Sequence, residues 1–174
     1  LKTTRYNDNT DIPNVTDGTA WPTLTTAAYC WYNDDDVTNK TTYGALYNWY
    51  AASSGKLCPT GWHMPVDAEW NTLITFLGGE GAAGGKLKER GTTHWIAPNI
   101  SATNAFGFTA LPGGVRLDNG SYSFIKERGF WWSASLADLL LGTAAYYEIN
   151  SDTGQSFHSS FLNSFGLSVR CVKD

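Results

Sequence analysis

The chain has 174 residues, of which 16 are Asp or Glu and 12 are Lys or Arg, so its formal net charge is −4 at pH 7. This length suits one domain of ordinary size, and the lack of a basic block argues against a nucleic-acid partner. Charged residues make up only 16% of the chain and aromatic residues 14%, a balance more typical of extracellular binding proteins than of cytosolic enzymes.

The first predicted helix follows a segment of loops and brief strands. Residues 1–42 are rich in Asn, Asp and Thr, which favours turns over a long helix. Leu46, Trp49 and Tyr50 then fall at i, i+3 and i+4, and Gly55 provides a stop signal. We therefore predict a helix over residues 43–53.

The second predicted helix has the clearest pattern in the chain. Trp70, Leu73, Ile74 and Leu77 lie at i, i+3, i+4 and i+7, and glycines follow at 78–79. This stripe is expected to face a core. A glycine-rich turn and a short helical piece at 86–89 are predicted next.

The second half of the chain is predicted to form short strands and long loops. It is dominated by glycine, serine and aromatic residues. The best strand candidates are residues 106–111, 130–132, 145–149 and 167–172. The predicted class is therefore α+β, with two helices in the first half and a small antiparallel sheet mostly in the second.

One stretch matches a cofactor-binding motif literally, but the elements predicted around it do not fit that motif. Residues 79–84 match GxGxxG literally, but a dinucleotide fingerprint follows a strand, whereas this stretch follows a predicted helix. The same stretch also lacks the spacing of a phosphate-binding loop. No cofactor is therefore expected.

The sequence points to no metal or catalytic centre. His63, His94 and His158 lie far apart, without the spacing of a metal or nucleophile motif. The Asn and Asp residues in the segment 7–11 are spaced like the first ligands of a calcium loop, but the glycine and distal Glu of an EF-hand are missing. Calcium binding stays open as an alternative, while no metal ligand and no catalytic residue is assigned.

Three cysteines allow one disulfide and one remaining thiol. We predict a bridge between Cys58 and Cys171, which would tie the start of the second helix to the last strand, with Cys30 as a buried free thiol; other pairings stay open. The longest apolar run, residues 136–147, is interrupted by Asp138 and Gly142. It is too short and too polar for a membrane span.

Several blocks in fixed order resemble the Fibrobacter succinogenes major paralogous domain. The resemblance implies a single domain over residues 1–174 with a C-type lectin-like fold, a noncatalytic binding module found extracellularly or on the cell surface of Bacteroidetes and related bacteria. Members usually have a further strand-rich segment before the position of Leu1, so a first strand is expected to be missing here. The blocks are residues 43–50 (YGALYNWY), 57–65 (LCPTGWHMP), 67–70 (DAEW), 84–88 (GGKLK), 104–114 (NAFGFTALPGG) and 168–174 (SVRCVKD).

Two departures from related patterns matter. Val66 stands where the family tends to have the serine that caps the second helix, and losing that oxygen costs about 1 kcal/mol unless another group replaces it. Classical calcium-dependent lectins use Glu-Pro-Asn and Trp-Asn-Asp motifs, whereas this chain has Ala-Pro-Asn at 97–99 and no Trp-Asn-Asp. Sugar binding of that classical kind is therefore not implied.

The candidate binding residues lie between Trp132 and Val169, where aliphatic and aromatic side chains replace the charged and polar ones usual in the family. The phenylalanines at 157, 161 and 165 would fit one helix face, but the serines between them disfavour a helix. On loops they would form an exposed apolar patch for a protein or glycan ligand. The predicted contact residues are Leu139, Leu140, Leu141, Tyr146, Tyr147, Phe157, His158, Phe161, Asn163 and Phe165.

The same region resembles the diversified part of variable proteins from diversity-generating retroelements. There, adenines in Asn-type codons are randomised, and Lys, Glu, Gln, Met and Trp are not reachable. These five types supply 22 of the 174 residues, so roughly three are expected among the 24 positions 133–145 and 156–166, and none occurs there. The resemblance implies a hypervariable binding surface formed by loops of residues 133–167.

Two other functions stay open. In the first, the chain is an adhesive or structural surface domain of fixed sequence, and the same side chains pack internally. In the second, it is an enzyme, by analogy with formylglycine-generating enzymes that share the broad fold, although their paired catalytic cysteines have no evident counterpart here. We predict a binding module that is not an enzyme.

Overall fold

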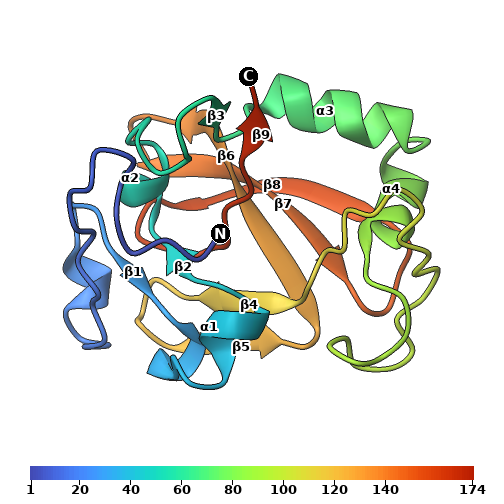
Figure 1. The fold of residues 1–174 in the computed structure, drawn as a ribbon, viewed down its shortest axis with the longest axis horizontal. Coiled ribbons are helices and arrows are strands. Elements are labelled where there is room, and N and C mark those ends of the chain that lie inside the picture. The colour runs from blue at the N-terminus through green and yellow to red at the C-terminus, as the bar shows by residue number, and fades with distance from the viewer.

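The computed structural model describes all residues 1–174 as a mixed α+β protein (Figure 1). The two longest helices, α3 and α4, lie together on one side of a curled sheet. The helices are the 3-10 helices η1 (Trp21–Thr23) and η2 (Tyr32–Asp34), and α1 (Asn39–Thr42), α2 (Trp49–Ala52), α3 (Asp67–Phe76) and α4 (Glu80–Leu87).

The main sheet has five strands in the order β5-β4-β6-β7-β8. Its pairs are antiparallel except β4 with β6, which is parallel, so the prediction of a purely antiparallel sheet is wrong at that pair. Two further sheets pair β1 with β2 and β3 with β9. The strands are β1 (Tyr29–Cys30), β2 (Leu46–Tyr47), β3 (Trp62–His63), β4 (Gly113–Arg116), β5 (Tyr122–Ile125), β6 (Arg128–Asp138), β7 (Thr143–Asn150), β8 (Ser156–Leu162) and β9 (Val172–Lys173).

Two hydrophobic cores lie on opposite faces of strands β6 and β7. Successive side chains of a strand point to opposite faces. Trp132 and Tyr146 are paired and belong to a core of 18 buried residues, whereas the neighbouring pair, Trp131 and Tyr147, belongs to a core of 10. The second core includes the apolar stripe of α3. The β6–β7 hairpin is therefore the shared wall of both cores.

Helix α3 confirms the predicted apolar stripe. At its N-terminus, the side chains of Glu69 and Ser135 accept hydrogen bonds where the family serine is missing. Val66 is the N-cap residue, and its N–H donates to Glu69 Oε2 at 3.0 Å. The Asp67 N–H donates to the hydroxyl of Ser135, on β6, also at 3.0 Å. A side chain from the neighbouring strand thus satisfies the first free N–H of the helix, whereas an N-cap serine would accept from the second or third.

The predicted helix over 43–53 is wrong except for its last turn. Leu46 and Tyr47 form β2 instead, and the backbone of Tyr47 exchanges two hydrogen bonds with Leu167, at 2.8 and 3.0 Å. The helix begins only after Asn48, whose side chain accepts from the Ala51 N–H at 3.1 Å. Long-range pairing of these backbone groups outweighs the local helical spacing.

The glycine-rich stretch after α3 is a helix and not a turn. Residues 80–87 form α4, which is longer than the predicted piece at 86–89. A Cβ on Gly84 would overlap the Gln155 carbonyl oxygen, and one on Gly85 would overlap that of Ser101. These glycines are needed because two other segments pack directly on the helix backbone, which explains their presence despite their low helix propensity.

Two strand predictions are also corrected. Residues 106–111 form no strand, since Thr109 has a positive φ of 53° and its N–H donates to the Asn104 side chain at 2.7 Å. Of residues 167–172, only Val172 enters a strand, β9, while Leu167 and Ser168 make isolated bridges. The predicted strands at 130–132 and 145–149 are confirmed within β6 and β7.

Lys88, directly after α4, is completely buried and holds three segments together. Its Nζ donates to the carbonyl oxygens of Ile100, Asn150 and Thr153, each at 2.8 Å. Burial lowers the pKa of Lys88 to about 8, so the ammonium group still carries its three donors at neutral pH. One side chain thereby fixes the turn after β7 and the loop at Ile100 against α4.

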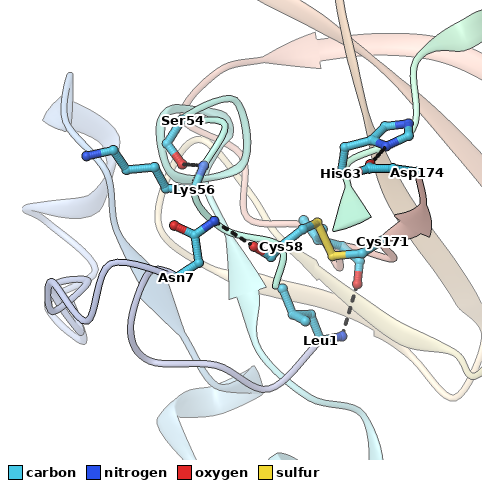
Figure 2. The surroundings of a disulfide bond; sticks show 9 residues. Leu1, Asn7, Ser54, Lys56, Cys58, His63, Cys171 and Asp174 are labelled. Atoms are coloured by element: carbon cyan, nitrogen blue, oxygen red, sulfur yellow. Dashed lines mark hydrogen bonds and ion pairs between the residues drawn. A yellow bond between two sulfur atoms is a disulfide. The ribbon is translucent and has the colours of Figure 1, made fainter. Parts of the chain in front are cut away.

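The predicted disulfide between Cys58 and Cys171 is confirmed, with Cα atoms 5.8 Å apart and a sequence separation of 113 residues (Figure 2). It lies beside the β3–β9 pair, and the Asn7 side chain donates to the Cys58 carbonyl at 3.1 Å. Cys30 is free and buried. The bridge therefore fixes the last strand against the segment that leads into α3.

His63 strengthens this junction in a pH-dependent way. His63 is hydrogen-bonded to Asp174 at 2.6 Å (Figure 2). This bond and a second one to Glu69, at 2.8 Å, raise the pKa of His63. A raised folded-state pKa gives stability that is complete below the unfolded value of 6.5 and is lost as the pH rises through the folded value.

We therefore expect the melting temperature of the wild type to exceed that of a His63→Gln variant most below about pH 6. This difference should shrink as the pH is raised from the unfolded value of 6.5 through the raised folded-state pKa of His63, measured by thermal unfolding in matched buffers. The comparison with the variant isolates the contribution of His63. A difference that stays constant across this range would contradict the assignment.

Candidate functional site

Three consecutive leucines at the turn of the β6–β7 hairpin are among the most exposed apolar residues of the protein. Leu139, Leu140 and Leu141 are 79%, 96% and 68% exposed; we call these three residues the leucine tip. Leu136 on β6 and Leu162 at the end of β8 are also exposed. They lie next to the tip, because Leu136 pairs with Ala144 and Leu162 pairs with Thr143 at the start of β7. Contiguous exposed apolar side chains usually mark an interaction site.

The backbone of the tip is ordered without help from the leucine side chains. The carboxylate of Asp138 accepts from the N–H groups of Leu140, at 2.8 Å, and Leu141, at 3.0 Å. Gly142 follows with a positive φ of 62°, a conformation that favours glycine. The turn therefore presents the leucines from a fixed backbone.

Strand β8 is an edge strand of the main sheet, and most of its side chains are exposed or half-buried. Phe161 stacks between Tyr146 and Phe165, with ring centroids 4.1 and 4.2 Å away. His158, on the other face, stacks on Tyr147 at 4.7 Å, and its Nε2 lies 3.3 Å from Asp67 Oδ2. Phe157 and His158 are exposed and accessible to a partner.

The structure separates the ten predicted contact residues into exposed and buried groups. Tyr146, Tyr147, Asn163 and Phe165 are buried, so their side chains do not face a partner. The expected loops of residues 133–167 are for the most part strands, since β6, β7 and β8 cover much of this segment. Consequently the accessible predicted residues are the leucine tip, Phe157 and His158, with Phe161 half-buried.

The prediction missed part of this surface. Leu136 and Leu162 are exposed beside the tip, and Ser159 and Ser160 are exposed on β8. Alternating polar and apolar residues would have indicated a strand with exposed positions at β8. The pattern is weak, because the Ser-Ser and Phe-Leu neighbours interrupt it. Strand β8 pairs with β7 on one side only, and Ser159, Ser160 and Leu162 are exposed on it.

The surface carries apolar, aromatic and hydroxyl side chains. No group of three or more His, Cys, Asp or Glu side chains lies close enough together to hold a metal ion. Burial raises the pKa of the Cys30 thiol to about 11, so it stays protonated at neutral pH. Apolar anchors, aromatic rings and serine hydroxyls remain, which suit contacts with a protein or a glycan.

Comparisons with known proteins place the chain in one family. The model described as the Fibrobacter succinogenes major domain matches residues 1–173. Neither a curated protein nor a solved structure matches significantly. None of the helices has the length and apolar character that crossing a membrane requires.

Proposed function

The chain belongs to the Fibrobacter succinogenes major domain family, and we propose that it is a noncatalytic ligand-binding module of a bacterial or phage surface or secreted protein. In this proposal its fold is C-type lectin-like, and a protein or glycan ligand binds to the surface formed by the leucine tip and the outer side of β8. The disulfide suits an oxidising, extracellular setting. The exposed leucine tip is the observation that carries the proposal.

The energetics of the tip favour a role in recognition. Leucine side chains exposed to this degree contribute little to folding, and each would gain about 1.5–3 kcal/mol if a partner buried it completely. A rigid turn also lowers the entropy lost on binding. Three adjacent anchors on a fixed backbone therefore form the centre of the proposed interface, with the exposed Leu162 at the end of β8 beside them.

We expect a Leu139→Ser, Leu140→Ser, Leu141→Ser variant to lose binding while it keeps its stability. The free energy of unfolding should change by less than about 0.5 kcal/mol per position, because these side chains are exposed. A panel of immobilised glycans and purified bacterial surface proteins, measured by surface plasmon resonance, provides the ligands. Each ligand that binds the wild type should bind the variant at least about tenfold more weakly.

Val37 provides the matched control, because it is 86% exposed and is not part of this surface. A Val37→Ser variant should bind the same ligands as the wild type. If ligands bind the leucine-tip variant as tightly as the wild type, the tip is not the binding surface.

We further propose that this surface is hypervariable, generated by a diversity-generating retroelement. The support is the absence of Lys, Glu, Gln, Met and Trp from positions 133–145 and 156–166. Sequencing the DNA that flanks the coding region tests this: a near-copy of the segment encoding residues 130–172, with mismatches at adenines and an adjacent reverse transcriptase gene, is expected. Absence of both features would favour the alternative, an adhesive or structural domain of fixed sequence.

Support for a noncatalytic role comes from the cysteines. Cys58 and Cys171 are joined in the disulfide, and Cys30 is enclosed in the core with a raised pKa. A nucleophilic pair of the kind used by formylglycine-generating enzymes would need accessible thiols of low pKa.

A further inference from the structure

A small apolar pocket lies between α3 and the segment that leads into β9, away from the leucine tip. Its volume is about 240 Å³. Trp70 and Leu73 on α3 form one wall, and Phe108 and Val172 contribute the others. Pockets for drug-sized ligands have about 300–1,000 Å³, so this pocket suits one group of the size of a single side chain.

One positive charge lines this pocket and has no partner. The guanidinium carbon of Arg170 lies 3.9 Å from the centroid of the Phe108 ring. Arg170 is exposed overall but makes neither a side-chain hydrogen bond nor an ion pair, and partial burial of its guanidinium lowers its pKa. Stacking on a ring occupies the face of a guanidinium but leaves the N–H groups on its edge free to donate.

The acidic residue at the same pocket does not neutralise Arg170. Glu69 Oε1 lies 2.8 Å from His63 Nε2, and Oε2 accepts the Val66 N–H at 3.0 Å. Its two oxygens are thus engaged on the side of the α3 N-terminus. The carboxylate of Glu69 nevertheless disfavours a dianion such as phosphate, because only Arg170 would offset the added charge.

We propose that this pocket binds a carboxylate carried next to one apolar or aromatic group, with the apolar group between Trp70, Leu73 and Phe108 and the carboxylate on Arg170. A guanidinium edge matches a carboxylate in a bidentate arrangement. A free peptide C-terminus ending in an apolar residue and a small free carboxylic acid both have this chemistry. The site shares no residue with the leucine tip, so it goes beyond the proposed function and can be tested separately.

The test uses the full chain, labelled with ¹⁵N, and two probes of the same shape, of which one carries a carboxylate and the other a neutral amide in its place. N-acetyl-L-phenylalanine should shift the amide resonances of residues 69–73, 108 and 170–172, and N-acetyl-L-phenylalaninamide should bind at least about tenfold more weakly. An Arg170→Gln variant should bind the acid no better than the amide. Arg128→Gln is the matched control, because Arg128 also stacks on a phenylalanine ring, at 4.6 Å, but lies outside the pocket.

Three results would overturn the proposal: equal affinity for the two probes, no shifts around the pocket, or unchanged acid binding by Arg170→Gln. If that variant does not fold, a Leu73→Trp variant provides a second test, because the larger side chain fills the pocket from α3. It should weaken the binding of both probes, and undiminished binding would overturn the proposal. Comparing N-acetyl-Gly-Gly-Phe with 3-phenylpropionate distinguishes the sources. Tighter binding of the peptide supports a chain terminus, and equal binding supports a free acid.

Discussion

Replacing Lys88 by methionine is expected to lower the free energy of unfolding by about 3–5 kcal/mol. Methionine has a similar unbranched shape, but it donates no hydrogen bond. The part-buried carbonyl oxygens of Ile100, Asn150 and Thr153 would then lose their donor, and each such loss costs about 1–3 kcal/mol. Urea denaturation followed by circular dichroism measures the change.

Lys86 supplies the control for this experiment. It is only half-buried, and its Nζ donates to a single carbonyl, that of Leu77, at 2.8 Å. A Lys86→Met variant should therefore lose only about 1 kcal/mol. If the two variants are equally stable, Lys88 does not hold the three segments together in the way described.

Removing the disulfide by the double substitution Cys58→Ser, Cys171→Ser is expected to cost about 4–5 kcal/mol. The bridge spans 113 positions of sequence, and in the chain-entropy model the loss grows with the logarithm of the length of the closed loop. The unfolded chain gains this freedom, so most of the effect arises in the unfolded state. The midpoint of urea denaturation, with and without a reducing agent, measures it.

A reducing agent should destabilise the wild type to the level of the double variant and leave that variant unchanged. Cys30→Ala is the control for the loss of a sulfur atom alone, and it should keep its response to reduction. A wild type that is equally stable with and without the reducing agent, while the bridge is demonstrably reduced, would contradict the prediction.

The parts of the fold that local patterns determine were predictable. The stripe of α3 fits only one periodicity, and it packs as predicted into the second core. The aromatic strands at 130–132 and 145–149 were predictable for the same reason, because β-branched and aromatic residues cluster there between turn signals. Each of these segments carries enough information within about ten residues to fix its structure.

Other parts depend on contacts far away in the sequence. The sequence around Leu46 has helical spacing, but the segment forms a strand because the backbone N–H and C=O of Tyr47 are hydrogen-bonded to the backbone of Leu167. The glycines of α4 suggest a turn until the segments that pack on them are known. Such long-range partners are not visible in a local pattern, and tertiary contacts outweigh propensity where the two conflict.

The candidate surface was only partly predictable because a spacing of four is ambiguous. Phe157 and Phe161 are four apart, which fits a helical face and also fits one face of a strand, where every second residue lies on the same side. In the structure both residues lie on the strand β8, and Phe165 is buried where it stacks on Phe161. The leucine tip was easier to identify, because three consecutive apolar residues follow directly after a turn-forming aspartate.

The turn of the β6–β7 hairpin also matters for protein engineering. Its conformation is fixed by Asp138 and Gly142, which lie on either side of the three leucines, and the strands behind it are anchored in two cores. A combinatorial library could therefore randomise residues 139–141 while these two positions are held constant. In such a display scaffold, new binding specificities could be selected without redesigning the domain, much as antibodies vary their loops on a constant framework.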